Sequence, residues 1–417
     1  MLKQKSIAPD YLWKLNTAII LWLSIGCSSS IKKQNEKETE PTHDTGDSRS
    51  DSATDSTSRT ATSNETETDM IDHSNINPLQ PTADCIHPEV IADCKDGWCR
   101  IPGGCFIFGS ADSEGNLCRG KYSEDQAQVT LTHDFEISQT ETTQAQWQAA
   151  GFDLPNPISK TSCADCPISW ITIYEAMAYC NALSVKTGLS ECYDLSNCTG
   201  ALAAGCPDDE SYIWNCLLDD NYVCLGEVHQ YDNQYACPGY RLPTTVEWEY
   251  AARAGTRTAT YAGNLEEDIP NECISHPSVD TIAWHCGNTR DGPKSQPRYF
   301  PVGKKIPNGF GLYDMLGNVG EYCSSTYQNR SVNYLVGQEG ALIDPDPPLE
   351  EYDPSMFVVL RSSYYIKNAC YMRSSYGYPG AFAKDRSILQ GFRPVRTLDI
   401  APSKLDTPPV AAPKKKK

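Results

Sequence analysis

Cysteine is the residue type that most constrains the fold of this chain. The 417 residues include 19 cysteines, and all but Cys27 lie between residues 85 and 370. Setting Cys27 aside leaves 18, an even number that favours a framework of disulfide bonds in an exported protein. The alternative is a zinc site, for which Cys163 and Cys166 form the single C-x-x-C pair. None of the seven histidines has ligand spacing with that pair, so we expect disulfides.

The first 27 residues have the pattern of an export signal. Lysines precede an apolar run at 17–26, which is too short to span a bilayer as a mature helix. The run ends at a small residue followed by Cys27, and this predicts a bacterial lipoprotein signal with Cys27 as the lipidated residue. An ordinary secretory signal with an incidental Cys27 is the alternative. We therefore expect a protein of the bacterial cell envelope, attached through a lipid anchor only and placed in the outer membrane, or a secreted one.

Composition divides the rest of the chain into a tether, a domain and a tail. Residues 28–84 have no aromatic residue and no cysteine, and this Ser-, Thr- and acid-rich composition predicts a disordered tether. Residues 85–397 predict one globular domain, with a Cys-rich insertion at 190–239. Residues 398–417 predict a disordered basic tail. The formal net charge of −19 argues against nucleic acid as a partner.

Local signals place a few regular elements in the domain. Threonine followed three residues later by Gln or Glu predicts a helix start with a capping box at three positions, Thr143, Thr172 and Thr244. Apolar alternation predicts strands at 100–110 and 128–137. In the third helix we interpret Glu247 as a cap residue and Glu249 as part of a solvated face, rather than as an acid–base pair.

Six blocks, in order between residues 100 and 396, resemble the formylglycine-generating enzyme family, also called sulfatase-modifying factors. They are IPGGCFIFGS, ISQTETTQAQW, PISWITIYEAMAYCNALS, YRLPTTVEWEYAARAG, PVGKKIPNGFGLYDMLGNVGEY and GFRPVR. On these motifs the chain is identified as a member of the family. The resemblance implies an α+β fold, a loop-rich variant of the C-type-lectin-like architecture, in a single domain with many disulfides.

The resemblance also gives a role to the acidic stretch GFGLYDMLGNVGEY. In family members this block wraps a structural calcium ion, which implies the side chains of Asp314 and Glu321 and the carbonyls of Gly317 and Val319 as ligands here. Calcium prefers a mixture of carboxylate and carbonyl oxygens. Without the resemblance, the block is interpreted as a plain turn with solvated carboxylates. The region around Asn288 departs from a second calcium pattern of the family, and no ligand is assigned there.

The catalytic signature of the family is missing. Active members bind copper through two cysteines that follow an RGGS motif and oxidise a substrate cysteine with dioxygen; thiolates are the ligands that Cu(I) prefers. In RSSYYIKNACYMRSS, Arg361 matches the motif, serines replace both glycines, and Lys367 and Met372 take the two cysteine positions. Copper is therefore not expected, and Cys370, at the wrong spacing, is a weak catalytic candidate.

Three interpretations of Cys370 stay open. It can form a disulfide, for example with Cys323, or it can be a reactive thiol that leaves another cysteine unpaired. It can also join Met372 in a remodelled copper site, although a methionine in an apolar loop more often serves packing.

These observations favour a divergent, non-copper family member that acts as a binding or accessory module for a protein or peptide ligand. Four tyrosines could line the ligand cleft or pack in the core: Tyr364, Tyr365, Tyr376 and Tyr378. The alternative is an active oxidase that converts a protein cysteine to formylglycine through a changed metal site. A structural envelope protein with no ligand is a third class. The iron oxidases among the relatives use clustered histidines on a separate helical domain, and this chain has no His-x-x-x-His.

Overall fold

The helices of the domain begin where the capping signals predict them. The computed structural model describes residues 80–110, 124–158, 162–206, 215–216, 221–266, 269, 271–290, 298–326, 342–345 and 353–398. The predicted signal, nearly all of the tether and the tail beyond residue 398 lie outside the described residues, as does Cys27. The described residues fall in one compact unit. Its longer helices are α2 (Gln144–Ala149), α3 (Ile173–Lys186) and α4 (Thr245–Arg253), each with a complete capping box on the predicted threonine.

Each of the two predicted strands is a pair of strands in different sheets. Residues 100–110 divide at Pro102 and Gly103 into β2 (Trp98–Ile101) and β3 (Gly104–Phe108). Residues 128–137 divide into β4 (Ala127–Leu131) and β5 (Phe135–Ser138). β2 pairs with β5 and β3 with β4, both antiparallel. The division has a local cause, because proline has no N–H for a strand ladder and a Cβ on Gly103 would lie 2.7 Å from the Leu131 carbonyl oxygen.

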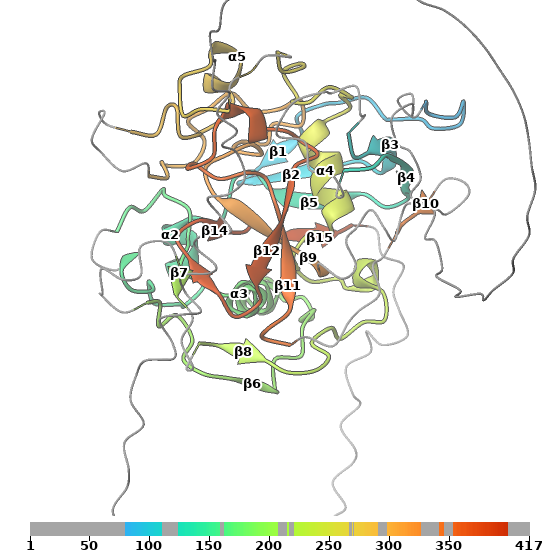
Figure 1. Cartoon of the computed structure of the whole chain (residues 1–417). Coiled ribbons are helices and arrows are strands. Elements are labelled where there is room, and N and C mark those ends of the chain that lie inside the picture. The colour runs from blue at the N-terminus through green and yellow to red at the C-terminus, as the bar shows by residue number, and fades with distance from the viewer. Residues whose placement is uncertain are drawn as a thin grey trace, which may run out of the picture. The chain divides into compact units, whose positions relative to one another are not determined.

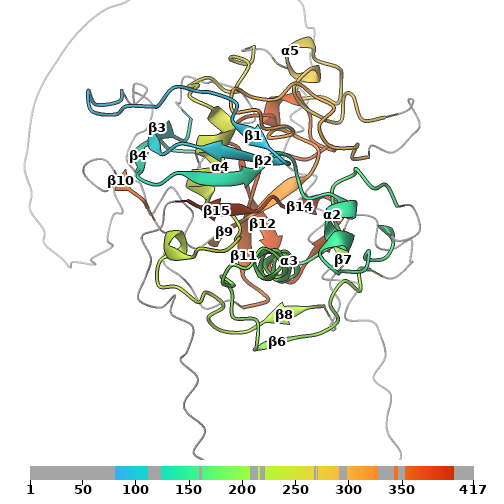
Figure 2. The same cartoon turned by 180° about the vertical axis from the view of Figure 1, so that it is seen from behind.

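Five small sheets make up the β-structure of the described residues. Their strand orders are β1-β2-β5-β15, β10-β4-β3, β12-β11-β9-β14, β13-β7 and β6-β8. The strands not yet given are β1 (Cys94–Lys95), β6 (Cys198–Thr199), β7 (Asn215–Cys216), β8 (Val223–Cys224), β9 (Gly320–Thr326), β10 (Leu342–Ile343), β11 (Phe357–Arg361), β12 (Gly377–Phe382), β13 (Arg386–Ser387), β14 (Gln390–Gly391) and β15 (Val395–Thr397). The remaining helical turns are η3 (Gln234–Ala236), α5 (Pro277–Asp280) and η4 (Ala369–Tyr371). Because β15 pairs with β5, the GFRPVR block returns to the first sheet (Figures 1 and 2).

Two helices organise the core. α4 packs against β3, β9 and β11 (Figure 1), and its Trp248, Ala251 and Ala252 are fully buried with the inward side chains of the first two sheets. α3 buries Tyr174 and Met177 in a second apolar cluster with the Cys-rich insertion. The structure thus confirms the expected α+β, loop-rich architecture with few helices.

Disulfides staple the loops, as the cysteine count predicts. Seven pairs lie within the described residues: 85–105, 94–99, 163–166, 192–237, 198–224, 206–216 and 273–286. Three of them join residues of the predicted insertion to one another. The C-x-x-C pair, Cys163 and Cys166, is a disulfide rather than half of a zinc site. Cys370 is also disulfide-bonded.

Two expectations about cysteines are wrong. Cys180 and Cys323 are free thiols, so not every cysteine of the domain is paired. The suggested Cys323–Cys370 bond does not form because the two residues belong to different apolar clusters, Cys323 beneath α4 and Cys370 around η4. Burial raises the pKa of both free thiols, which keeps them protonated and inert.

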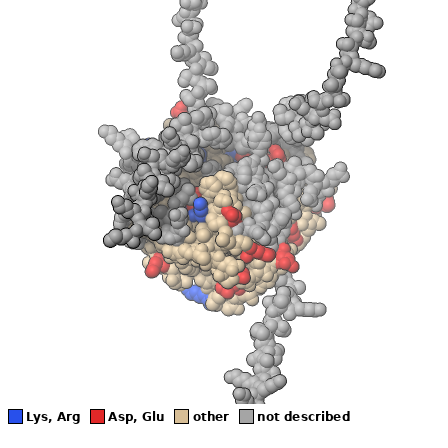
Figure 3. All heavy atoms as spheres, turned by 60° about the horizontal axis from the view of Figure 1, so that its bottom comes forward, with Lys and Arg blue, Asp and Glu red and all other residues tan. Residues whose placement is uncertain are grey.

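One face of the molecule shows how charged side chains are distributed. On the face in Figure 3, carboxylates are spread more widely than basic groups over the described area. This distribution accords with the formal net charge of −19. Among the residues that the structure describes, no helix is long and apolar enough to cross a bilayer.

Candidate functional site

The stretch GFGLYDMLGNVGEY forms a tightly wound loop that leads into β9. Asp314, Gly317 and Asn318 all have positive φ, at 55°, 81° and 55°. A Cβ on Gly317 would lie 2.1 Å from the carbonyl oxygen of Trp284, a distance that no real side chain tolerates. Position 317 therefore requires glycine for two reasons, the positive φ of its backbone and the closeness of the Trp284 carbonyl.

Three carboxylates gather beneath this loop. Asp314 and Glu321, the two side chains expected to bind calcium, are fully buried, and so is Glu141. Burial, together with the negative charges of Asp314 and Glu321, raises the pKa of Glu141 well above its usual range. Burial likewise raises the pKa of Asp314. Arg393 is the guanidinium that forms an ion pair in this cluster, with Glu321. The ionised cluster therefore carries an excess of negative charge that a cation would relieve.

The carboxylate oxygens differ in their availability to a metal. Oδ2 of Asp314 accepts a hydrogen bond from the Gly303 amide at 2.7 Å, whereas the buried Oδ1 has no hydrogen-bond partner in the described structure. Both oxygens of Glu321 accept from Arg393 at 2.7 Å, and Oε2 also accepts from Trp248 Nε1 at 2.7 Å. Since a carboxylate oxygen can accept two hydrogen bonds, Oε1 of Glu321 keeps one lone pair. Asp314 is thus the open ligand position, and Glu321 is already committed to Arg393.

Glu141 holds the loop in shape, a role that sequence reasoning missed. Its side chain accepts hydrogen bonds from Asn318 Nδ2 at 2.7 Å and from the Val319 amide at 3.0 Å. It therefore fixes the segment that carries the two expected carbonyl ligands, Gly317 and Val319. No group of three or more His, Cys, Asp or Glu side chains suited to a metal occurs within the described ranges. The expected donor set has two side chains and two carbonyls, and the orphaned Asp314 oxygen fits it.

The stretch that replaces the RGGS motif is buried and docks on this loop. Ser362 has φ of 64°, and its Oγ accepts a hydrogen bond from the Gly317 amide at 3.0 Å. Arg361 donates to Glu249 Oε2 at 2.5 Å and to the Ser374 carbonyl at 2.9 Å. Glu249 also accepts from Arg253 at 2.7 Å. The expected solvated face for Glu249 is therefore wrong, because two guanidiniums compensate its burial.

The two positions where the family has copper-binding cysteines are built differently from each other. Met372 is fully buried with Cys370 in the apolar cluster around η4. Lys367 is partly exposed, and its Nζ lies 5.7 Å from the ring centroid of Tyr364 and 5.1 Å from that of Tyr371. Because Cys370 is disulfide-bonded, it is not a reactive thiol. Within the described residues this stretch offers no thiolate.

The tyrosines proposed to line a cleft are mostly core residues. Tyr364, Tyr365 and Tyr376 are buried, and Tyr376 packs edge-on against Tyr371 at 5.3 Å between ring centroids. The side chain of Tyr378 lies outside the described residues. The packing interpretation thus holds for the three that are described.

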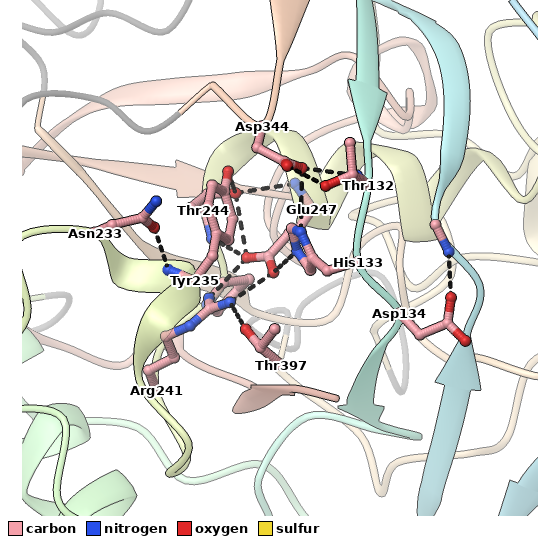
Figure 4. A network of polar contacts seen from close by, with 12 residues as sticks. Thr132, His133, Asp134, Asn233, Tyr235, Arg241, Thr244, Glu247, Asp344 and Thr397 are labelled. Atoms are coloured by element: carbon pink, nitrogen blue, oxygen red, sulfur yellow. Dashed lines mark hydrogen bonds and ion pairs between the residues drawn. The ribbon is translucent and has the colours of Figure 1, made fainter. Parts of the chain in front are cut away.

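The RLPTTVEWEY block forms a second polar network, shown in Figure 4. Glu247 caps α4, as expected, and also pairs with the buried Arg241 at 2.7 Å. His133, between β4 and β5, lies between Glu247 and Asp344 (Figure 4). Although burial opposes its charge, hydrogen bonds to Asp344 and Glu247 raise the pKa of His133 to about 9. The network ties α4 to the β4–β5 connection.

Comparison with known families agrees with these motifs. A family model described as "Sulfatase-modifying factor enzyme 1-like domain" matches residues 88–398. The chain belongs to this family. The match spans the described core from the segment before β1 to the end of β15 and includes both the loop of Asp314 and the altered RGGS stretch.

Individual relatives within the family differ in what their names state. "Chaperone protein LppX" of Paenibacillus barcinonensis is 32% identical over 216 residues, 49% of this chain and 66% of that protein. A "Formylglycine-generating enzyme" of Mycobacterium tuberculosis is 40% identical over 89 residues, 21% of this chain and 28% of that protein. An "Inactive C-alpha-formylglycine-generating enzyme 2" of Mus musculus is 37% identical over 111 residues, 25% of this chain and 32% of that protein. The chain thus spans less than two thirds of each of these relatives.

Proposed function

We propose that this family member is a binding or accessory module for a protein or peptide, and not a copper oxidase. One observation carries the proposal: the two cysteine positions of the altered RGGS stretch hold Lys367 and Met372, and the neighbouring Cys370 is closed in a disulfide. The thioether of Met372 is one soft ligand for Cu(I), but the amine of Lys367 does not replace the second thiolate, so the soft pair of ligands is lost. Relatives named as a chaperone and as an inactive enzyme support a non-oxidase role within the family.

The proposed location is the bacterial cell envelope. Seven disulfides within the described residues support folding in an oxidising compartment outside the cytoplasm. The signal pattern that ends at Cys27 supports attachment through a lipid on that residue. The Ser- and Thr-rich segment at 28–84 would then hold the domain away from its anchor.

We further propose that the loop of Asp314 binds calcium as a structural ion. Asp314 Oδ1, the carbonyls of Gly317 and Val319, and the remaining lone pair of Glu321 Oε1 would hold it. Its charge would offset the excess negative charge of Asp314, Glu321 and Glu141. The ion would contribute stability to the loop, and no chemical step is assigned to it.

The oxidase alternative is tested with the purified full chain and a peptide that contains one cysteine. Oxygen consumption is followed after addition of Cu(I), with the appearance of an aldehyde in the peptide measured by mass spectrometry. The binding proposal predicts neither oxygen uptake nor peptide aldehyde above the level of free copper. Stoichiometric conversion of the peptide would replace the proposal with the oxidase.

The binding function needs its own positive test. A peptide array is incubated with the folded chain and, in parallel, with the reduced and unfolded chain. Peptides retained by the folded chain alone support the module. If no peptide is retained, the third class, a purely structural envelope protein, gains the support instead.

A further inference from the structure

The disulfide between Cys163 and Cys166 closes the shortest loop among the seven pairs of the described residues. Its cysteines are three positions apart, whereas those of the other pairs are 5 to 45 positions apart. In the chain-entropy account, a disulfide stabilises a fold by restricting the unfolded chain, and this effect grows with the length of the loop. The pair at 163 and 166 therefore contributes least to holding the fold, and we expect the chain to stay folded when this bond opens.

The two cysteines of this loop differ in their access to solvent. Cys163 is partly exposed, whereas Cys166 is only 5% exposed. Thiol–disulfide exchange begins when a thiolate attacks one of the two sulfurs, and its rate depends on which sulfur can be reached. An incoming thiol reaches Cys163 more easily, and the sulfur of Cys166 would then be the leaving group. The exposure of the pair thus gives its two cysteines different roles.

Hydrogen bonds hold the backbone of the loop independently of its sulfur atoms. The amide of Gln144, the first residue of α2, donates to the Cys166 carbonyl at 2.9 Å, and Gln144 Oε1 accepts from the Cys163 amide at 2.9 Å. The Val302 amide donates to the Asp165 carbonyl at 2.8 Å, which attaches the loop to a second segment. These bonds remain when the disulfide is reduced, so the two thiols would stay close together and could pair again.

Accessibility alone does not distinguish this disulfide from the others. Cys273 is exposed and its partner Cys286 is buried, but that bond joins positions 13 apart. The bond between Cys94 and Cys99 spans only five positions, but it joins β1 to β2. A Cβ on Gly311 would lie 2.8 Å from Cys94 Sγ, so the backbone at residue 311 covers that sulfur. The pair at 163 and 166 combines the shortest loop of the described disulfides with an accessible cysteine.

We propose that the Cys163–Cys166 disulfide exchanges with a pair of thiols in a protein or peptide partner and oxidises them. A thiolate of the partner attacks Cys163 Sγ, the bond to Cys166 Sγ breaks, and Cys166 leaves as a thiolate that takes up a proton. The second thiolate of the partner then attacks the partner's sulfur in this mixed disulfide. That step forms the partner's disulfide and releases Cys163, which is protonated in turn. The partner loses two electrons and two protons and the cysteine pair gains them, so one turnover needs no other oxidant. The inference rests on the proposed binding function for the class of partner and adds the chemistry that would act on it.

The test is oxidation of a reduced synthetic peptide with two cysteines by the folded full chain in the absence of oxygen. Free thiols are alkylated with N-ethylmaleimide at successive times, and mass spectrometry gives the oxidised fraction of the peptide. We expect about one equivalent of peptide disulfide per chain, because each chain carries one such exchangeable pair. Peptide mapping of the protein should place the new thiols at Cys163 and Cys166. Thermal unfolding before and after the reaction checks that the chain remains folded.

Two double variants make the result specific. Cys163→Ser with Cys166→Ser should slow peptide oxidation at least about tenfold, whereas Cys273→Ser with Cys286→Ser, which also removes one accessible and one buried cysteine, should leave it unchanged.

The single variants test the roles of the two cysteines. With the oxidised peptide as the starting material, Cys166→Ser should accumulate a mixed disulfide on Cys163, at least about tenfold more than Cys163→Ser accumulates on Cys166. Equal accumulation in both overturns the assignment of Cys163 as the attacked sulfur. No peptide oxidation by the wild type, or equal oxidation by the two double variants, overturns the inference as a whole. These outcomes leave the copper, oxygen and peptide-array results of the proposed function untouched, so the two proposals can fail separately.

Discussion

The hydroxyl of Ser362 accepts a hydrogen bond from the amide of Gly317 at 3.0 Å. This bond joins the altered RGGS stretch to the loop of Asp314, two blocks that are 45 residues apart. Ser362 stands where the family motif has a glycine, and its φ of 64° retains the backbone that a glycine would adopt. The altered RGGS stretch thus contacts the loop of Asp314 through a serine that stands where the family motif has a glycine.

The Arg393–Glu321 ion pair should be a major contributor to stability. Arg393→Met leaves Glu321 buried without its cation, and we expect a loss of about 3–5 kcal/mol in the free energy of unfolding. Urea denaturation of the oxidised chain measures it. Arg100→Met is the matched control, because the Arg100–Asp134 pair is 52% and 28% exposed and should be worth about 0–1 kcal/mol. Equal losses in the two variants would contradict this account of the cluster.

Alanine substitutions at Gly317 and Gly97 distinguish the cost of a left-handed backbone from the cost of a steric clash. Their φ values are 81° and 83°, but a Cβ on Gly97 meets nothing within 4 Å while one on Gly317 meets the Trp284 carbonyl at 2.1 Å. Gly97→Ala should cost only the left-handed penalty of about 1–2 kcal/mol. Gly317→Ala should cost clearly more, because the loop must also move away from Trp284. Thermal unfolding gives the decrease in melting temperature of each variant. A similar decrease in both would show that the loop moves away from Trp284 at little cost.

Local chemistry in the sequence predicted the parts of this fold that depend on neighbours along the chain. Thr143, Thr172 and Thr244 cap their helices because the partner of each cap lies three residues away. The environment of Glu249 was not predictable in this way, since its partner Arg361 is 112 residues distant. The cysteine count predicted the disulfide framework but not which cysteines stay unpaired. Parity cannot reveal that Cys180 and Cys323 are packed as small apolar residues.

The sequence motifs identify candidate site residues, but they do not predict the contacts that these residues make. The order of the blocks points to Asp314 and Glu321 as candidate ligands and to Lys367 and Met372 as substitutions, and these remain predictions. Nothing in the sequence indicates that Glu141, from a distant block, accepts hydrogen bonds from Asn318 and Val319. The ion pair between Arg393 and Glu321 is equally hidden in the sequence. The paired residues lie 177, 178 and 72 positions apart in the sequence, and only the assembled fold brings them together.

His133 should make stability depend on pH in the alkaline range. Its pKa rises from 6.5 to about 9 on folding, so its contribution is fully present below about pH 6.5 and is lost as the pH rises through about 9. The shift corresponds to on the order of 3 kcal/mol. The difference in unfolding free energy between wild type and His133→Gln, measured from pH 6 to 10, should therefore shrink with rising pH. A constant difference would mean that His133 is neutral in the folded chain.

Calcium should raise the melting temperature of the full chain through Asp314. Asp314→Asn removes a charge from the proposed ligand set and should abolish most of the shift between calcium and chelator. Asp353→Asn is the control, because Asp353 is exposed and its hydrogen bonds are to Ser355. If calcium gives the wild type and Asp314→Asn the same shift, the ion binds elsewhere. If it shifts neither, the loop is complete without a metal.

The central claim is that loss of two thiols turned an oxidase scaffold into a non-copper module. Competitive titration of Cu(I) against a chelator, comparing wild type with the double variant Lys367→Cys and Met372→Cys, tests it most directly. The account predicts no copper uptake by the wild type and at least tenfold tighter binding by the double variant, about 1.4 kcal/mol or more. Stoichiometric, high-affinity copper binding by the wild-type chain would contradict it.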